Sequence, residues 1–350
     1  MMRSLAAAYE VFLALQRFIR LPAFGFSALL ALLGAASVAP GLPAWRLWGL
    51  LGATLAFHQF GYVLNDVIDL PIDRLHPGRA GYPLVRGWLK PWHALAYALA
   101  QIPLAFAISA WLGAGVWAYA ALAAAFLGLG VYDMWGKRTR LPPLTDALQG
   151  LGWAALALYG AIVAGGAPAR LSWILAAWVV LYIVLVNGVH GSLRDLASDT
   201  AAGALTTAIL LGARPGARAP LRLLGYTAAL QAALAALALW PLLGGSFGYA
   251  GGEWAGVFAA TLAIQAACAW CSALLFWPRA GLSIVAPVMG YIILSLVGLI
   301  VLFGPYLAPT ARAFVLASYF GPLVVHDSFY RVVGWLWRRC RPALVSAASR

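Results

Sequence analysis

Residues 45–73 read WRLWGLLGATLAFHQFGYVLNDVIDLPID, an almost uncharged run that ends in Asp66, Asp69 and Asp73. An apolar run of about 20 residues is what a helix needs to cross a hydrocarbon core of roughly 30 Å. A carboxylate beside lipid is costly unless a metal or a partner compensates its charge. The stretch therefore predicts a membrane-spanning helix that ends at a site for a polyvalent cation.

The rest of the chain has the same apolar composition. Of its 350 residues, 64% are hydrophobic and 9% are charged, and the mean hydropathy is +0.87. Soluble domains carry roughly 25% charged residues. We therefore expect an integral membrane protein, and its long continuous apolar runs favour helices over the short alternating strands of a barrel.

The expected fold class is all-α, a multi-pass bundle of about nine spans in one domain that covers residues 1–350. A tenth apolar stretch, 313–336, is interrupted by Pro322, His326, Asp327 and Arg331, and the sequence leaves open whether it crosses the membrane. We assign 313–350 to an extra C-terminal helix with a basic tail, and 2–18 to an amphipathic helix on the membrane surface. The predicted spans are 22–39, 45–65, 92–112, 115–133, 145–166, 169–192, 220–243, 254–277 and 284–306.

The formal net charge of +13 comes from bases in the loops between the spans. Such bases are typical of orientation signals and of contacts with anionic lipid headgroups, so we expect membrane lipids and no nucleic acid as partners. Most of them follow even-numbered spans. By the positive-inside rule, the protein lies in the cell membrane with these loops and an active site facing the cytoplasm.

A second acidic cluster, Asp195-Leu196-Ala197-Ser198-Asp199, follows the sixth span, four spans after the first cluster. The two clusters hold five of the ten acidic residues in the chain. Their spacing suggests two pseudo-repeated four-helix halves that bring the clusters together across a central cavity. The clusters are alike in character rather than in sequence, so the repeat is a hypothesis.

The spacing within each cluster favours a metal site. On a helix, Asp66, Asp69 and Asp73 share one face, and so do Asp195 and Asp199. Mg²⁺ binds through one or two carboxylates together with phosphate oxygens of a substrate. Solvated acids at a helix end would explain a lone pair, but not three aligned acids with a second cluster on the same side. We therefore predict that all five aspartates bind Mg²⁺ and act in catalysis.

Asn65-Asp66-x-x-Asp69-x-x-x-Asp73 resembles the N-D-x-x-D-x-x-x-D signature of the UbiA superfamily of intramembrane prenyltransferases, and Asp195-x-x-x-Asp199 resembles the second aspartate motif of that family. The resemblance covers nearly the whole chain. There are two departures. Tyr82 stands where the family usually has an arginine before proline, so Arg79 is a candidate to take over its role, and the family's Tyr-x-x-x-Lys element is one residue longer here, from Tyr132 to Lys137.

The resemblance implies a diphosphate held by two Mg²⁺ ions and by nearby polar groups. Arginine can bind such a group in bidentate fashion, whereas lysine meets it as a point charge. For each base, membrane topology is the competing explanation. The candidate diphosphate-binding residues are Asn65, Arg79, Lys137, Arg138 and Arg194.

Polar and aromatic residues near the motifs are candidates for a substrate pocket. An aromatic face can stabilise a cation, and a histidine can orient an acceptor or receive its proton. Ordinary packing and interfacial placement are the competing explanations. The candidates are His58, Tyr62, Tyr132, Asn187 and His190.

What the resemblance implies for function is Mg²⁺-dependent transfer of a prenyl group from an isoprenyl diphosphate donor to an unidentified hydrophobic acceptor, aromatic or lipid-like. A membrane terpene cyclase of the same superfamily would ionise the same donor without an acceptor. A transporter is the alternative from another class. Transporters place ionisable groups near the bilayer midplane, whereas these acids lie at span ends on one side.

Overall fold

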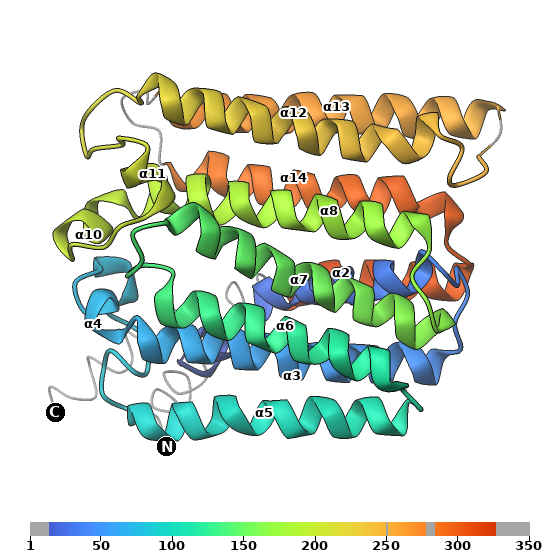
Figure 1. The fold of residues 1–350 in the computed structure, drawn as a ribbon, viewed down its shortest axis with the longest axis horizontal. Coiled ribbons are helices and arrows are strands. Elements are labelled where there is room, and N and C mark those ends of the chain that lie inside the picture. The colour runs from blue at the N-terminus through green and yellow to red at the C-terminus, as the bar shows by residue number, and fades with distance from the viewer. Residues whose placement is uncertain (1–13, 250, 278–283, 327–350) are drawn as a thin grey trace, which may run out of the picture.

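The computed structural model describes residues 14–249, 251–277 and 284–326, and in these residues it contains helices and no β-strand. The all-α prediction is confirmed. The long helices lie roughly parallel or antiparallel, with α12 and α13 along one side and α5 along the opposite side (Figure 1). The long helices are α2 (Leu21–Ala36), α3 (Ala44–Ile68), α5 (Pro91–Trp111), α6 (Val116–Trp135), α7 (Pro142–Gly165), α8 (Arg170–Leu185), α12 (Leu221–Leu243), α13 (Gly251–Phe276) and α14 (Val285–Phe303).

Nine helical stretches among the described residues are long and apolar enough to cross a membrane, at the positions that the sequence predicts. The first differs most, because it runs from Ala14 to Ala36 rather than from residue 22. Residues 14–19 are helical and join α2 through Arg20, whose φ of 47° is left-handed. The predicted surface helix over 2–18 falls mainly on residues 1–13, which lie outside the described part of the chain.

The tenth apolar stretch packs within the bundle over its described part, residues 309–326. The ring of Phe314 meets that of Trp48 on α3 edge-on, with 5.0 Å between centroids. The Tyr319 hydroxyl donates a 3.4 Å hydrogen bond to the Ile293 carbonyl of α14. The helix therefore lies among the spans in this part. The predicted basic tail over 327–350 lies outside the described residues.

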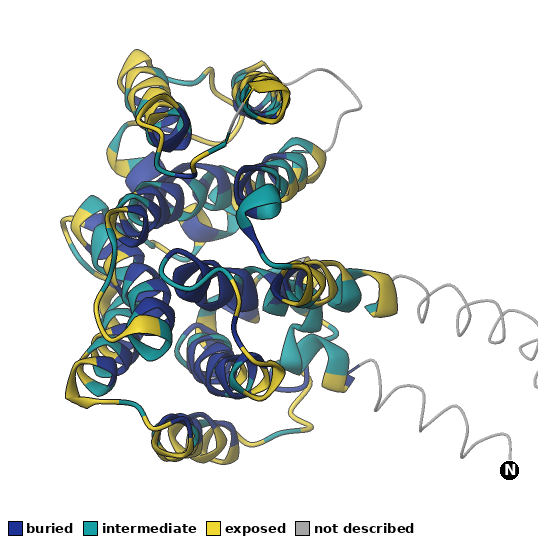
Figure 2. Ribbon diagram, turned by 90° about the vertical axis from the view of Figure 1, so that its right-hand side faces the viewer, coloured by how far each residue is buried: buried dark blue, intermediate teal, exposed yellow. Residues whose placement is uncertain are grey.

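The outer helices expose apolar side chains. Figure 2 shows exposed residues on the outward sides of the bundle and buried residues on the inward sides. Trp92 on α5, Trp117 on α6 and Trp270 on α13 are at least 60% exposed. Exposed apolar surface of this extent fits lipid better than water. Together with the nine spans, it identifies a multi-pass membrane protein.

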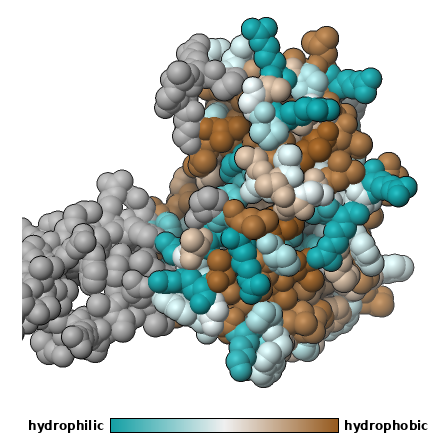
Figure 3. All heavy atoms as spheres, turned by 90° about the vertical axis from the view of Figure 1, so that its left-hand side faces the viewer, coloured by the Kyte–Doolittle hydropathy of each residue, from teal (hydrophilic) through white to brown (hydrophobic). Residues whose placement is uncertain are grey.

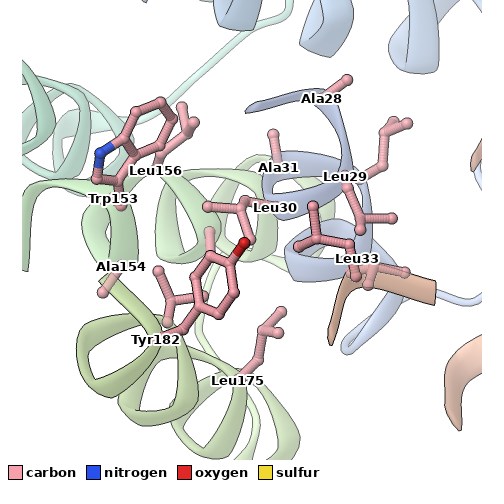
Figure 4. Close-up of a cluster of buried hydrophobic side chains, with 14 of the residues drawn as sticks. Ala28, Leu29, Leu30, Ala31, Leu33, Trp153, Ala154, Leu156, Leu175 and Tyr182 are labelled. Carbon is pink, nitrogen blue, oxygen red and sulfur yellow. The ribbon is translucent and has the colours of Figure 1, made fainter. Parts of the chain in front are cut away.

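The core is built where α2, α7 and α8 meet. Leu30 of α2 lies near Tyr182 of α8, and Leu29 of α2 and Trp153 of α7 belong to the same buried cluster (Figure 4). Tyr182 and both leucines are almost wholly buried. The cluster thus joins α2, α7 and α8 into one apolar core.

Glycines let α2 and α7 approach within backbone contact. A Cβ at Gly34 would lie 1.9 Å from the carbonyl oxygen of Ala157, and a Cβ at Gly160 would lie 2.0 Å from that of Ala31. Helices in membranes gain most of their association energy from such close packing, because lipid tails are as apolar as the helices.

Gly160→Ala is expected to destabilise the protein by about 1–3 kcal/mol, because the added methyl forces α2 away from α7. Thermal unfolding of purified protein in detergent measures the loss. Gly225→Ala on α12 is the control, since a Cβ there meets nothing within 4 Å. Equal unfolding midpoints for the two variants would contradict the packing argument.

Candidate active site

Both acidic motifs lie where a long helix is interrupted at an aspartate. Asp69 (φ −85°, ψ 1°) separates α3 from the short α4 (Leu70–Asp73). Asp195 (φ −98°, ψ 8°) separates α9 (Ser192–Arg194) from α10 (Leu196–Ala201). Both backbones fall in the sparsely populated bridge region. The expected single helical face through the first motif is thus broken, and α4 and α10 lie at one end of the bundle (Figure 1).

The two motifs are also alike in sequence. Residues 69–73 read DLPID and residues 195–199 read DLASD, so Leu follows the first Asp and a second Asp comes four residues after it in both. The matching backbone breaks make Asp69 the counterpart of Asp195, and Asp73 that of Asp199. Asp66 has no acidic counterpart, because Ser192 stands at that position. The similarity of the two motifs is thus visible in the sequence itself.

A cavity of about 440 Å³ opens between the motifs. Figure 3 views this end of the bundle, where hydrophilic side chains project between hydrophobic ones. The cavity therefore joins a charged mouth to an apolar interior. Of the predicted residues, it is lined by Asn65, Asp69, Asp73, Arg79, Lys137, Arg194, Asp195, Asp199, Tyr62, Tyr132 and Asn187; its apolar lining includes Phe26, Trp153, Tyr182, Ile292 and Leu296.

Lys137 brings the two motifs together. Its Nζ lies 3.0 Å from Asp69 Oδ2 and 3.6 Å from Asp199 Oδ1. A second link is made by His76, whose Nε2 lies 3.7 Å from Asp195 Oδ1. Carboxylates separated by more than a hundred residues thus meet across one ammonium group.

Arginines neutralise the remaining motif carboxylates. Asp66 pairs with Arg20, and Arg79 Nη1 lies 3.8 Å from its Oδ1. Arg79 Nε lies 3.7 Å from Asp73 Oδ1. Asp195 accepts two hydrogen bonds from Arg194, of 2.9 Å from Nε and 2.6 Å from Nη2.

The lysine and arginine side chains that pair with the motif aspartates affect where a metal ion can bind. Within the described residues, no group of three or more His, Cys, Asp or Glu side chains is already arranged around a common metal position. The donor chemistry nevertheless fits a hard cation, because the available ligands are carboxylate oxygens. Asp199 Oδ1 is buried and accepts no hydrogen bond from the described residues. A cation could bind here once the bases exchange their carboxylates for another anion.

The ion pairs shift the ionisation of the motif residues that lie beyond the spans. Burial raises the pKa of Asp199 and of Asp73, and Lys137 and Arg79 offset this only in part. Burial also acts to raise the pKa of Asp195, but the Arg194 hydrogen bonds and charge outweigh it, so that the pKa falls below the ordinary value. Burial acts to lower the pKa of Lys137, yet Asp69 and Asp199 raise it overall. Lys137 thus stays protonated at neutral pH.

Arg79 also packs on the residue at which the family pattern departs. Its guanidinium carbon lies 4.6 Å from the centroid of the Tyr82 ring. Arg20 faces the Tyr62 ring at 4.9 Å. Two arginines and two tyrosines therefore form one wall of the mouth.

Four predicted residues lie outside the cavity lining. His58 is fully buried between Ser27 Oγ (2.8 Å) and the Ile19 carbonyl (3.1 Å). His190 bonds Ser272 Oγ at 3.1 Å and packs on the Tyr291 ring. Both histidines face neighbouring helices, which places them away from the predicted pocket. The other two are Asp66, turned to Arg20, and Arg138, which is exposed beside a smaller surface pocket.

Sequence reasoning missed other lining residues. Arg20 was not among the candidate site residues, although a base at the start of an apolar span can face a cavity. Asp133 and Asp146 are acids at span ends on either side of Lys137, and acids in such positions are rare unless they are functional. Gln149 and Thr206 gave no signal that distinguishes them from packing residues. All five line the cavity.

Comparison with known proteins gives a consistent result. A family model described as the UbiA prenyltransferase family matches residues 27–284. A digeranylgeranylglyceryl phosphate synthase of Pyrococcus abyssi (strain GE5 / Orsay) is 29% identical over 195 residues, which span 53% of this chain and 64% of that protein. The chain thus matches less than two thirds of the length of this relative.

Solved structures share the fold. The apo structure of a UbiA homolog from Aeropyrum pernix K1 has a TM-score of 0.62 at 24% identity, over 79% of this chain and 97% of that one. A UbiA homolog from Archaeoglobus fulgidus, bound to DMAPP and Mg²⁺, has a TM-score of 0.61 at 19% identity, over 87% and 99% of the two chains.

Lys137→Gln is expected to lower the stability of the metal-free protein by about 1–3 kcal/mol, because Asp69 and Asp199 lose their shared counter-charge. Thermal unfolding in detergent with a chelator measures this. Lys90→Gln, at an exposed position before α5, is the matched control. An unfolding midpoint for Lys137→Gln at or above that of the unmodified protein would contradict the bridging role.

Proposed function

Because the chain belongs to the UbiA prenyltransferase family, we propose that it transfers a prenyl group from an isoprenyl diphosphate to a hydrophobic acceptor within the membrane, with Mg²⁺ as its cofactor. The observation that carries this proposal is the convergence of Asp69 and Asp199 on Lys137 at the mouth of an apolar cavity. The homolog that binds DMAPP and Mg²⁺ on the same fold supports it.

The motif carboxylates would hold the metal. Asp69 and Asp73 from the first motif and Asp195 and Asp199 from the second line one cavity mouth, with Asp66 behind them. Mg²⁺ in such a site neutralises diphosphate charge and acts as a Lewis acid on its oxygens. The matched backbone breaks at Asp69 and Asp195 supply one half-site from each motif.

The bases would change partners when the donor binds. In the described structure, Lys137, Arg79 and Arg194 each hold a carboxylate. A metal–diphosphate complex offers those carboxylates a cation and offers the bases phosphate oxygens, so every charge keeps a counter-charge. Asn65, whose Nδ2 lies 3.3 Å from both Asp69 Oδ2 and Asp133 Oδ1, positions these carboxylates. Arg138 lies outside this cavity, in a neighbouring pocket that shares Asp69 and Lys137 with it, and we leave it out of the proposed arrangement.

The apolar interior suits the isoprenoid tail and its cation. When the allylic C–O bond breaks, both electrons leave with the diphosphate, and a carbocation forms at the released carbon. Phe26, Trp153 and Tyr182 line the cavity, with the Phe26 ring 4.7 Å from that of Trp153 and 5.6 Å from that of Tyr182. Their faces can stabilise the cation. The electron-rich atom of the acceptor then forms the new bond and loses a proton.

A terpene cyclase is the second candidate, because ionisation and an aromatic interior serve cyclisation equally well. Incubation of purified protein with Mg²⁺ and farnesyl or geranylgeranyl diphosphate alone separates the two functions. A cyclic hydrocarbon would establish cyclisation. For a transferase we expect a prenylated product only after an acceptor is added, detected by mass spectrometry across a panel of acceptors.

We also propose that the motif end faces the cytoplasm. The loop after α3 and α4 and the loop after α6 carry bases at this end, among them Arg74, Arg86 and Arg140. The positive-inside rule places such loops on the cytoplasmic side. Labelling of single cysteines introduced into these loops, in intact cells and in lysed cells, tests the orientation.

Asp69→Asn and Asp195→Asn are each expected to lower Mg²⁺-dependent turnover at least about 100-fold, because each removes the charge of a metal ligand while keeping its shape. Diphosphate release from the donor is the measurement. Glu253→Gln, an exposed carboxylate at the start of α13, is the matched control and should retain full activity. Normal turnover in either aspartate variant would remove that residue from the proposed metal site.

Arg79→Ala is expected to weaken donor binding by about 1–3 kcal/mol, the range for one lost charge-assisted hydrogen bond. The donor KM should therefore rise more than kcat falls. Arg218→Ala, in an exposed loop, serves as the control. If Arg79→Ala leaves the donor KM unchanged, Arg79 has no contact with the diphosphate. Its role is then to set the orientation of the protein in the membrane.

A further inference from the structure

One wall of the cavity carries polar groups that the metal–diphosphate site does not use. It is formed by Asp146 and Gln149, one turn apart on α7, and by Asn187 on the π-helix η2 (Val186–Gly191) that follows α8. A π-helix within a long helix often marks a functional site. We call Asp146, Gln149 and Asn187 the α7–η2 wall.

The carboxylate of this wall has no basic partner. Of the described carboxylates that line the cavity, Asp146 and Asp133 are the two without an ion pair, whereas the motif aspartates are all paired. Asp146 Oδ2 accepts a hydrogen bond from Thr207 Oγ1, and its Oδ1 accepts none from the described residues. Asp146 is 5% exposed, so it is a nearly buried acceptor that faces the cavity.

Each of the two amide side chains of the wall also has one polar atom without a hydrogen-bond partner among the described residues. Asn187 Nδ2 donates to Gln149 Oε1, which leaves the Gln149 amide nitrogen and the Asn187 oxygen without partners among the described residues. Thr206 also lines the cavity, and its buried hydroxyl has no partner in the described part of the chain. An unpaired buried hydroxyl such as that of Thr206 is costly and calls for a ligand or water.

The backbone of η2 approaches the Asp146 carboxylate closely at Gly188. A Cβ at Gly188 would lie 2.6 Å from Asp146 Oδ2, so a side chain at this position would displace the Asp146 carboxylate. Asn187, the residue before Gly188, donates a hydrogen bond to Gln149 in the same contact. The wall therefore lies at a close contact between α7 and η2.

The wall borders the diphosphate site. Tyr132 lines the same cavity as Asp146, Asp69 and Asp199, and all three carboxylates act electrostatically on its hydroxyl. A molecule bound at the wall would therefore lie beside the end of the donor where the C–O bond breaks. A nucleophile has to come within about 3–3.5 Å of that carbon to react.

We propose that the α7–η2 wall is the acceptor subsite, and that it selects an acceptor whose bound end is an uncharged hydroxyl group; this inference rests on the proposed transferase function. A hydroxyl can donate to Asp146 and accept from the amide of the wall. A carboxylate or phosphate at the same place would face an unpaired carboxylate without any base, which costs binding energy. Phenols and lipid alcohols share the required chemistry.

The test compares acceptors in which an uncharged hydroxyl group is replaced by an anionic group, with full-length enzyme in detergent and geranylgeranyl diphosphate as donor. One pair is 4-hydroxybenzyl alcohol and 4-hydroxybenzoate, and the other is a monoalkylglycerol and its phosphate. We expect the neutral member to have at least about tenfold higher kcat/KM. The pair that reacts shows whether the acceptor that supplies the hydroxyl group is a phenol or a lipid alcohol.

Two variants separate recognition from folding. Asp146→Asn keeps an acceptor atom for Thr207 and should raise the acceptor KM at least about tenfold, with the donor KM unchanged. Gln149→Lys adds a base to the wall and should move the preference toward the anionic member at least about tenfold, a change that a structural role would not produce. Glu253→Gln is the control for the loss of a carboxylate.

Preference of the unmodified enzyme for the anionic members, or variants that alter neither the acceptor KM nor the charge preference, would overturn the inference. Diphosphate release in the same reactions shows what has failed. If Mg²⁺-dependent release persists with acceptor transfer but without charge preference, the subsite assignment alone is wrong. If release is absent, or yields only a cyclic hydrocarbon, the transferase proposal fails and the subsite assignment fails with it.

Discussion

The contact of Lys137 with Asp69 and Asp199 is the interaction on which the rest of the site depends. These carboxylates lie at the edge of an apolar bundle, where unpaired charges are costly. One ammonium group joins α3–α4, α6 and α10 at a common level. The same arrangement can exchange partners, because a metal and a diphosphate offer each charge a new counter-charge. Stability without substrate and readiness to bind it thus come from the same ion pairs.

The interruptions of the helices at Asp69 and Asp195 determine the positions of the motif carboxylates. Asp69 and Asp195 adopt nearly the same backbone conformation, and each begins a short helix that carries a second aspartate. A straight continuation of α3 would carry Asp73 past the cavity mouth. The likeness of DLPID and DLASD shows that the two motifs resemble each other in sequence as well as in backbone conformation.

The cavity divides its charges between two regions. Every motif aspartate has a basic partner, whereas Asp146 and Asp133 have none among the described residues. Paired charges suit a highly charged ligand that brings its own metal, and unpaired hydrogen-bonding groups suit a neutral one. The apolar lining from Phe26 to Leu296 suits a hydrocarbon chain. The transferase that we propose could thus distinguish donor head, donor tail and acceptor by the charge and polarity of these regions.

The sequence by itself determined the all-α class, the positions of the nine spans and the two aspartate motifs. These properties are local, since the length of an apolar run and the cost of a charge in lipid depend on neighbouring residues only. The tertiary structure alone decided which side chains face the cavity. His58 and His190 turn to neighbouring helices, whereas Arg20, Asp146 and Gln149 turn inward. The rotation of each helix is set by contacts between distant residues, such as Gly34 with Ala157, and no local pattern records it.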